Sequence, residues 1–355
     1  MEKERCFSYP DENWDFQNKI ERIYDSLVDA ESIDIFQNRF MYSMTRDYRY
    51  MNNMVSKISA GKMFVDTLRR KCQGGGIIIY GAGIKGTRLV NLFPEVNWIG
   101  YIDKELEGTV CNGLPVYGLN KCKEITSTIL ISNTMNYMQI KNDLIELGIE
   151  EQQRVMLRAY DLIESENIYF DSSVMSPNML DAQKYFVDAG CYDGNDTQNY
   201  FDFIQDSHAL VYAIEPDKKN YLRCRDRLSK YENTVVENLG IADEENVVNF
   251  DQTNTSSSKF CEMGEDSVRI RTIDSIFLNK EVGMIKMDIE GYEEKAILGA
   301  AETIKRCHPI LALSIYHKQS DIWKLPSLLL ELNPDYKFYL RHYTVGVTDT
   351  VIYAI

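Results

Sequence analysis

Acidic side chains flank a turn of small residues in the stretch KYFVDAGCYDGNDT, residues 184–197. The apolar run 185–187 ends in Asp188, and Gly190 and Gly194 follow before residues that can begin a helix. Because glycine has no Cβ atom, its backbone can approach a ligand closely. Carboxylates around such a turn would repel a pyrophosphate, but they suit a ligand that has a cationic centre and a ribose. S-adenosylmethionine is a ligand of this kind.

Further polar side chains lie where the neighbouring expected elements begin or end. Glu215 ends the apolar run of VYAIEP, where its carboxylate can accept both ribose hydroxyls. Asp196 and Thr197 begin the helix after the turn, and the free N–H groups of that helix can bind the methionine carboxylate. Asp196 could equally be only a helix cap. Asp243 follows the next strand and is placed for the adenine amine, or is only a loop residue. We expect the cofactor to be held by Asp188, Gly190, Gly194, Asp196, Thr197, Glu215 and Asp243.

Two residues farther along the chain could act on the acceptor of a methyl group. The run IKMDIEG places Lys286, Asp288 and Glu290 on one face of a strand, with Asp288 near the sulfonium. His317 directly follows the apolar run ILALSIY. With an ordinary pKa of about 6.5 it is our candidate for a general base, which a hydroxyl acceptor needs because its own pKa is high. His317 could instead cap the next helix or bind a backbone group.

The sequence gives little sign of a metal centre. Asp288 and Glu290 together could hold a divalent ion, as carboxylates do in some sugar O-methyltransferases, but no third ligand is evident, so we expect no metal. The eight cysteines are scattered and form no C-x-x-C pair. In a chain of this length, such spacing is typical of reduced thiols in the cytoplasm rather than of a disulfide framework or a zinc site.

Alternating strand and helix patterns must position these residues between about 165 and 355. Such alternation indicates a parallel sheet with helices on both faces, and a ligand crevice at the carboxyl ends of its strands. The last two apolar runs, YKFYLRHY and TVIYAI, are separated by a short loop and should form an antiparallel hairpin at the sheet edge. We therefore expect an α/β fold with the doubly wound sheet and C-terminal antiparallel hairpin of a class I methyltransferase domain.

Five motifs in this region resemble, in order, those of the FkbM family of S-adenosylmethionine-dependent methyltransferases. They are FVDAGCYDGNDT, AIEPD, TIDSI, IKMDIEGYE and ILALSIYHK. The most specific is IKMDIEGYE together with the helix pattern that follows it. The resemblance implies an enzyme with S-adenosylmethionine as its cofactor, bound by the residues named above.

A second glycine turn, GAGIKG, lies between about residues 73 and 160. Gly81, Gly83 and Gly86 follow a strand pattern, and Asp103 ends the next one. This spacing fits the dinucleotide fingerprint and its ribose acid, but the segment has the size of only half a dinucleotide fold. The pattern after it looks like the small nucleotide-binding-like domain attached to some sugar-modifying enzymes. We expect a small Rossmann-like domain that carries either a second nucleotide site or a tight turn without ligand.

Residues 1–72 show helical spacing of apolar residues and no strand signal, which indicates a helical arm that packs on its neighbour or mediates a homo-oligomer. The net charge of −15 disfavours sequence-independent binding of nucleic acid and of anionic membranes. The start, MEKERCFSYP, lacks the apolar core of a signal peptide. We expect a cytoplasmic protein with a small-molecule partner.

Together these patterns predict methyl transfer from S-adenosylmethionine to a hydroxyl of a sugar or secondary-metabolite acceptor. One alternative is an NAD- or nucleotide-sugar-linked enzyme that uses the GAGIKG turn. The other is a non-catalytic scaffold that keeps the fold.

Overall fold

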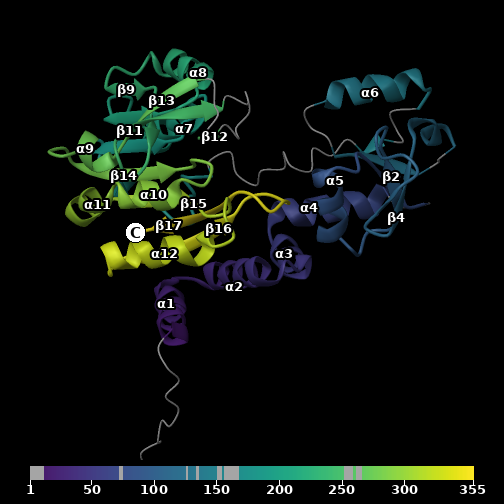
Figure 1. The fold of residues 1–355 in the computed structure, drawn as a ribbon, viewed down its shortest axis with the longest axis horizontal. Coiled ribbons are helices and arrows are strands. Elements are labelled where there is room, and N and C mark those ends of the chain that lie inside the picture. The colour runs from purple at the N-terminus through teal and green to yellow at the C-terminus, as the bar shows by residue number, and fades with distance from the viewer. Residues whose placement is uncertain are drawn as a thin grey trace, which may run out of the picture. The chain divides into compact units, whose positions relative to one another are not determined.

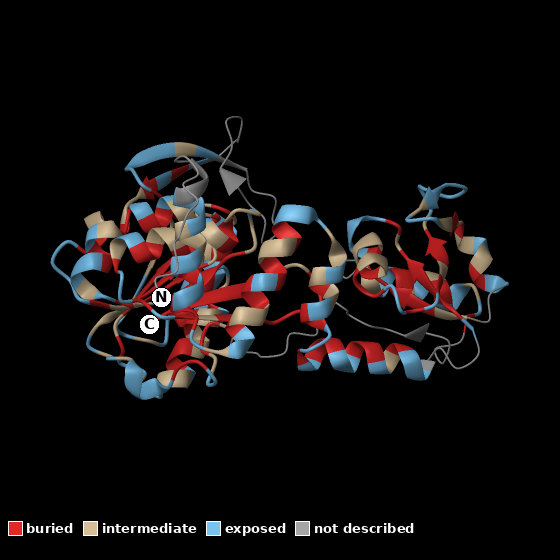
Figure 2. Cartoon of the chain, turned by 90° about the horizontal axis from the view of Figure 1, so that it is seen from below, coloured by how far each residue is buried: buried red, intermediate tan, exposed pale blue. Residues whose placement is uncertain are grey.

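The computed structural model describes residues 12–71, 75–124, 127–132, 136–149, 154–155, 168–251, 259–260 and 266–355. The chain forms two compact units. The first comprises Met1–Phe36, Asn167–Arg341 and Thr350–Ile355, and the second comprises Gln37–Glu166 and His342–Asp349. The boundaries expected at residues 72–73 and 160–165 lie outside the described residues. In each unit the buried residues are concentrated in the strands and on the inner faces of the helices (Figure 2).

A seven-stranded sheet forms the centre of the first unit (Figure 1). In spatial order its strands are β16 (Phe338–His342), β17 (Thr350–Ala354), β15 (Ile310–Ser314), β14 (Val282–Met287), β7 (Tyr185–Ala189), β8 (Val211–Ile214) and β9 (Thr234–Glu237). The pairs of β14 with β15 and β7, of β7 with β8 and of β8 with β9 are parallel, whereas β17 runs antiparallel to β15. The predicted doubly wound α/β sheet is confirmed.

Helices connect the parallel strands of this sheet, because two parallel strands cannot be joined by a tight turn. They are α7 (Asn195–Ile204), α8 (Lys218–Leu228), α10 (Glu293–Leu298), α11 (Ala301–Cys307) and α12 (Asp321–Leu332). The first helix, α1 (Glu12–Ser26), packs on α12, where the rings of Phe16 and Trp323 meet edge to face at 6.2 Å. The N-terminal helix therefore packs on the surface of this unit, with Phe16 40 % exposed.

Aromatic side chains under β7 fix the position of α7, the helix that follows the acidic glycine turn. Phe186 of β7 stacks on Tyr200 of α7, with ring centroids 4.2 Å apart, and Phe170 packs on both rings. Phe170, Phe186 and Tyr200 are all less than 2 % exposed. Aromatic pairs of this kind contribute about 0.5–1.5 kcal/mol beyond the burial of their area, so they hold the start of α7 against the end of β7.

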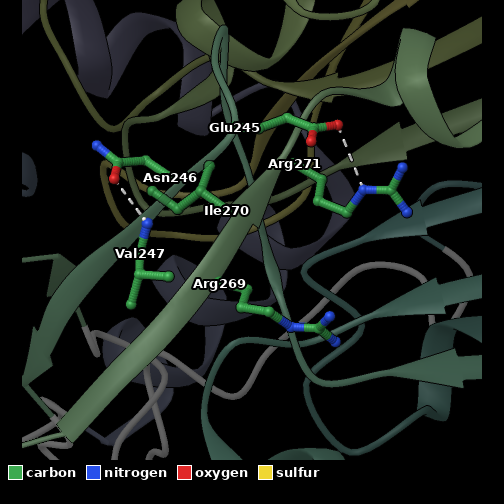
Figure 3. A pocket seen from close by; sticks show the side chains of 6 residues that line it. All are labelled: Glu245, Asn246, Val247, Arg269, Ile270 and Arg271. Atoms are coloured by element: carbon green, nitrogen blue, oxygen red, sulfur yellow. Dashed lines mark hydrogen bonds and ion pairs between the residues drawn. The ribbon is translucent and has the colours of Figure 1, made fainter.

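A smaller four-stranded sheet has the order β10 (Gly240–Ile241), β13 (Asp266–Arg271), β11 (Asn246–Asp251) and β12 (Lys259–Phe260). The short helix α9 (Ile273–Ile276), which forms most of the motif TIDSI, follows β13. Glu245, Arg269 and Arg271 line an open pocket on this sheet (Figure 3). The Arg271 guanidinium lies 3.5 Å from Glu245, and none of the expected site residues lines this pocket.

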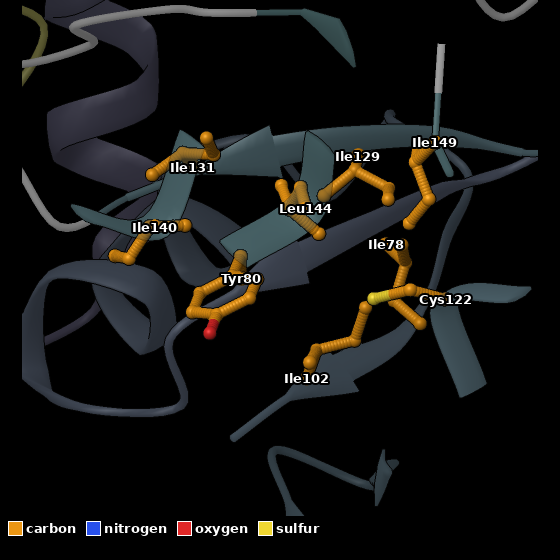
Figure 4. Close-up of a cluster of buried hydrophobic side chains, with 9 residues drawn as sticks. All are labelled: Ile78, Tyr80, Ile102, Cys122, Ile129, Ile131, Ile140, Leu144 and Ile149. Atoms are coloured by element: carbon orange, nitrogen blue, oxygen red, sulfur yellow. The ribbon is translucent and has the colours of Figure 1, made fainter. Parts of the chain in front are cut away.

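The second unit contains a six-stranded sheet with helices. The strands have the order β3 (Val110–Cys111), β4 (Leu114–Tyr117), β2 (Trp98–Ile102), β1 (Ile77–Tyr80), β5 (Thr128–Ile131) and β6 (Arg154–Val155), and only the β3–β4 pair is antiparallel. The helices are α3 (Tyr48–Val55), α4 (Ser59–Lys71), α5 (Ile84–Leu92), α6 (Tyr137–Glu146) and, across the boundary between the units, α2 (Ala30–Thr45). Isoleucines of β1, β2 and β5 pack against Ile140 and Leu144 of α6 (Figure 4).

In the described part of the chain, no helix has both the length and the apolar character needed to span a membrane.

Candidate active site

The acidic glycine turn lies between β7 and α7, and its two glycines are required by geometry. Gly190 has φ +78°, and a Cβ atom there would lie 2.0 Å from the carbonyl oxygen of Asp288. Gly194 has φ +83°, and a Cβ atom would lie 3.0 Å from Cys224 Sγ. The left-handed backbone and the close contacts both exclude larger residues. The turn is therefore built tightly against the end of the neighbouring strand β14.

Asp188 lies beneath this turn and is fully buried. Its Oδ2 accepts a hydrogen bond of 2.6 Å from Thr197 Oγ1, and its Oδ1 lies 3.0 Å from Nζ of Lys286. Lys286 is the residue opposite Asp188 in the parallel pairing of β7 and β14. It also donates to the Gly190 carbonyl at 2.7 Å and lies 3.3 Å from Asp196 Oδ2. One buried ammonium thus joins the floor of the turn to the first turn of α7.

The charges of this group depend on each other. Burial by itself lowers the pKa of Lys286, but the carboxylates of Asp188, Asp196 and Asp288 together raise it above its ordinary value. Burial raises the pKa of Asp196, against the opposing effect of Lys286. Lys286 is therefore a permanent cation in the site. The sequence pattern places it on the same face as Asp288 but gives no sign of its pairing with Asp188.

Glu215 follows β8, beside the turn, and its carboxylate is 7 % exposed. One oxygen accepts from the backbone N–H of Tyr192 at 2.9 Å and the other from that of Asp217 at 2.8 Å. Burial raises the pKa of Glu215 to about 7, although the two backbone hydrogen bonds lower it. A carboxylate oxygen has two lone pairs, so each oxygen can still accept one hydroxyl of a ribose.

Asp243 is exposed in the loop after β10, and its Oδ1 is 3.5 Å from Lys295 Nζ of α10. A Cβ atom at Gly299 would lie 2.0 Å from the carbonyl oxygen of Ala242. The loop that carries Asp243 is therefore packed on the end of α10.

The second group of expected residues gathers where β14 and β15 end. His317 Nε2 lies 3.3 Å from Asp288 Oδ1 and 3.7 Å from Glu290 Oε2. His317 Nδ1 lies 2.9 Å from Oε1 of Glu293, a carboxylate that is 1 % exposed and that also accepts from the Ile289 N–H at 3.0 Å. The expected pair of Asp288 and His317 is thus in contact, within a cluster of three carboxylates around one imidazole.

Glu293 is the member of this cluster that the sequence pattern does not indicate. It is the first residue of α10, where an acidic residue is common because it interacts favourably with the helix dipole. Its contact with His317 depends on the fold, since β15 and the rest of α10 and α11 separate the two residues along the chain.

Hydrogen bonds connect Asp288 to the residues at the end of β15 and to the segment before β7. Tyr169 Oη donates to Asp288 Oδ2 at 2.9 Å and lies 3.1 Å from Ser314 Oγ, while Tyr316 Oη lies 3.5 Å from Asp288 Oδ1. Tyr169 is buried, and burial raises the pKa of its hydroxyl well above the ordinary value, so it remains a donor. The Asp288 carboxylate is therefore held in one orientation.

The three carboxylates govern the charge of His317. Burial by itself lowers the pKa of the imidazole, but Glu293, Asp288 and Glu290 together raise it to about 9. An imidazole with this pKa carries a proton at neutral pH and has no free lone pair to take another. The cluster thus attracts a positive charge strongly. Ligand atoms of Asp288, Glu293 and His317 lie within 4.8 Å of one another, a spacing that could hold a metal ion.

The GAGIKG turn of the second unit is tight, and Asp103 accepts a hydrogen bond from one of its backbone N–H groups. Gly81 has φ +105°, and a Cβ atom at Gly86 would lie 2.0 Å from the Gly81 carbonyl oxygen. Asp103 accepts from the Ala82 N–H at 3.0 Å through one oxygen and from two N–H groups of its own loop through the other. At Gly83, by contrast, a Cβ atom would meet nothing within 4 Å. The fold thus explains Gly81 and Gly86 without a ligand and leaves Gly83 unexplained.

The sheet order, the acidic turn after its first strand and the carboxylates at the ends of the next strands define a class I methyltransferase fold. Residues 188–343 match the model of the methyltransferase FkbM domain. The resemblance of the five motifs is thereby confirmed.

Comparison with solved structures supports the same fold. The chain is similar to the crystal structure of methyltransferase FkbM from Methylobacillus flagellatus KT, with 19 % identity and a TM-score of 0.52 over 88 % of this chain and 99 % of that one. Weaker similarity is found to a SAM-dependent methyltransferase from Aquifex aeolicus, with 13 % identity and a TM-score of 0.32 over 53 % and 90 % of the two chains. No curated protein matches the sequence.

Proposed function

We propose that this protein transfers the methyl group of S-adenosylmethionine to a hydroxyl of a sugar or secondary-metabolite acceptor. The observation that supports this most is the meeting of two groups of residues at one edge of the sheet. The Gly190 turn and Glu215 form the first, and Asp288 with His317 forms the second. The main chain joins them, because Gly190 packs on the carbonyl of Asp288.

S-adenosylmethionine is the cofactor, in agreement with the match to the FkbM methyltransferase domain. In our proposal the N–H groups at the start of α7 bind the methionine carboxylate, and Glu215 accepts the two ribose hydroxyls. Asp243 binds the adenine amine from its exposed loop. Asp188 and Asp196 act mainly through Lys286, with which both are paired, and so set the shape and charge of the turn.

Methyl transfer is an in-line displacement at the carbon attached to sulfur. The leaving thioether is a good one, so the protein contributes chiefly by aligning donor and acceptor. A sugar hydroxyl has a high pKa and must be activated to attack. In our proposal Asp288 and His317 bind that hydroxyl, since Gly190 packs on the Asp288 carbonyl and His317 lies 3.3 Å from Asp288. Because His317 carries a proton at neutral pH, it must first lose this proton to act as the general base.

The acidic character of the site and of the whole chain supports a neutral or cationic small acceptor over a nucleic acid, because binding a phosphate backbone requires basic surface. The net charge is −15. We propose that the second unit presents the acceptor or mediates assembly, and that the protein acts in the cytoplasm.

Calorimetric titration with S-adenosylmethionine tests the cofactor site. We expect saturable binding by the intact chain and a loss of affinity in Glu215→Ala, with Glu232→Ala, an exposed carboxylate before β9, as the matched control. Release of S-adenosylhomocysteine upon addition of sugar acceptors tests the reaction. Absence of binding at high micromolar cofactor, or unchanged affinity in Glu215→Ala, would refute the site assignment.

A further inference from the structure

Three carboxylates and one imidazole meet at the acceptor end of the site, and this group has the composition of a metal centre. We infer that Asp288, Glu290 and His317 bind a divalent transition-metal ion, with Glu293 as the outer carboxylate that orients the imidazole. The role that we infer for the ion, binding the acceptor hydroxyl, rests on the proposed function. The binding of the ion does not.

His317 is the central ligand. Its side chain is 9 % exposed, and both ring nitrogens, Nδ1 and Nε2, are buried and make no hydrogen bond of normal geometry. Nε2 nevertheless lies 3.3 Å from Asp288 Oδ1 and 3.7 Å from Glu290 Oε2. Separations slightly above 3 Å are those of neighbouring donor atoms around one ion, because each ligand lies about 2.0–2.2 Å from the metal. Nε2 therefore lies near both carboxylates, and ligand atoms of Asp288, Glu293 and His317 lie within 4.8 Å of one another.

Glu293 supplies the second requirement of such a site. A histidine that binds a metal through one nitrogen usually donates its other N–H to a carboxylate or carbonyl, which fixes the tautomer and the ring orientation. Here Glu293 Oε1 lies 2.9 Å from Nδ1, and its position is fixed in turn by the Ile289 N–H at 3.0 Å. An ion that displaces the proton of His317 would then bind Nε2, the nitrogen that lies near Asp288 and Glu290.

The backbone of Glu290 is strained in a way that supports a functional role. Glu290 has φ +55°, in the left-handed region that a residue with a side chain rarely adopts, whereas Gly291, with φ +95°, adopts it freely. Strained residues of this kind are found mainly at functional sites. The result is that the Glu290 carboxylate turns back toward His317 instead of continuing along the strand.

Charge balance favours a divalent ion over a single proton. Asp288, Glu290 and Glu293 place three carboxylates around one imidazole, and a cation among them would compensate their negative charges. Lys286, the nearest buried ammonium on the same strand, is already paired with Asp188 and Asp196. A proton on His317 compensates one negative charge, whereas a divalent ion with neutral imidazole compensates two.

The mixed donor set indicates which ions would bind. Imidazole nitrogen suits zinc, iron, copper and nickel, and carboxylate oxygen suits manganese and magnesium. One nitrogen with two carboxylates therefore fits Mn²⁺, Fe²⁺, Co²⁺ or Zn²⁺ better than Mg²⁺ or Ca²⁺.

The ion would act as a Lewis acid and as a template for the acceptor. The hydroxyl oxygen binds the ion and its proton leaves to solvent. The oxygen then forms its bond to the methyl carbon as the carbon–sulfur bond breaks, and the electron pair of that bond stays on sulfur.

Electron paramagnetic resonance of Mn²⁺ tests the site directly. The full chain is stripped with EDTA, desalted and titrated with Mn²⁺ alone, and the loss of the signal of free Mn²⁺ measures binding. We expect one ion per chain. Glu293→Gln should weaken binding ~10–100-fold, as loss of an outer partner does, and His317→Asn and Asp288→Asn should weaken it further. Glu294→Gln, the adjacent and more exposed carboxylate, is the matched control and should bind as the unaltered chain does.

Calorimetry with S-adenosylmethionine and thermal unfolding, run on the same variants, separate loss of the ion from loss of the fold. Equal Mn²⁺ affinity in His317→Asn and in the unaltered chain would overturn the metal site while leaving the methyltransferase assignment intact. Conversely, tight Mn²⁺ binding without any binding of S-adenosylmethionine would uphold the ion and refute the proposed function.

Discussion

The ammonium of Lys286 lies 3.0 Å from Asp188 Oδ1, and these side chains are 1 % and 0 % exposed, respectively. The two residues are directly opposite each other on adjacent parallel strands. Because Lys286 also donates to the Gly190 carbonyl, this pair connects the sheet to the backbone of the turn that we propose binds the cofactor.

Replacing Lys286 with methionine should destabilise the first unit strongly. Removing one partner of a buried ion pair leaves the other charge uncompensated and typically costs about 3–5 kcal/mol. Urea denaturation measures this change. The double variant Lys286→Met with Asp188→Asn should recover part of the loss, since Asp188 is then neutral and only Asp196 has lost its cationic partner. If the single and double variants are equally unstable, the loss of stability does not come from the uncompensated charge of Asp188.

The affinity for S-adenosylmethionine should rise with pH through about 7, the pKa to which burial raises Glu215. Both oxygens of the ionised carboxylate accept hydrogen bonds, whereas one oxygen of the protonated carboxyl carries a proton. The ionised form therefore binds the two ribose hydroxyls better. Calorimetric titrations between pH 5.5 and 8.5 would show the change, and Glu215→Gln should bind more weakly with no such dependence. A pH-independent affinity of the unaltered chain would contradict this role.

The raised pKa of Glu215 affects folding stability in the opposite direction: stability should fall as the pH rises. A carboxyl whose folded pKa lies above its unfolded value favours folding when protonated. This contribution of Glu215 is present below its ordinary pKa of 4.5 and is lost as the pH rises through about 7. The shift corresponds to ~3 kcal/mol. Denaturation curves of Glu215→Gln and the unaltered chain should therefore differ more at pH 8 than at pH 5.

Alanine at Gly190 should abolish cofactor binding, because its Cβ atom would lie 2.0 Å from the Asp288 carbonyl oxygen and φ is +78°. Overpacking of this kind typically costs about 1–3 kcal/mol. Thermal unfolding and calorimetry together measure both effects. Retention of full affinity in Gly190→Ala would show that the turn does not contact the cofactor.

The three glycines of GAGIKG allow a matched comparison in the second unit. Gly86→Ala should destabilise this unit, since the added Cβ atom would meet the Gly81 carbonyl oxygen at 2.0 Å, whereas Gly83→Ala meets nothing within 4 Å and should be neutral. Fluorescence titration with NADH should give no saturable signal with the unaltered chain. A saturable signal that Gly83→Ala removes would instead support a nucleotide site at this turn.

The residues that end strands were the most predictable part of the site. Asp188, Glu215 and Asp288 each follow an apolar run, and carboxyl ends of parallel strands meet at one edge, so the pattern alone brings them together. His317 follows the same logic at the end of β15. The parallel sheet and its edge strands follow from the alternation of strand and helix.

The pairings of these residues were not predictable from sequence. Whether Lys286 faces Asp188 depends on the register of two strands that are almost a hundred positions apart. Glu293 has the place of an ordinary helix-start acid, and only the packing of α10 against the end of β15 brings it to His317 Nδ1. Such contacts are set by tertiary packing, which local periodicity does not encode.

The contact of Gly190 with the Asp288 carbonyl has a thermodynamic consequence. The Asp288 N–H also donates to the Ala189 carbonyl at 3.1 Å. The backbone of the Gly190 turn and the backbone of Asp288, which carries the proposed acceptor site, therefore cannot shift independently. Binding of S-adenosylmethionine at the Gly190 turn should therefore alter the affinity for the acceptor at Asp288. Binding of the acceptor should alter the affinity for S-adenosylmethionine by the same factor. We expect S-adenosylmethionine and the acceptor to bind with mutual cooperativity, and S-adenosylhomocysteine, which lacks the sulfonium charge, to promote the acceptor's departure.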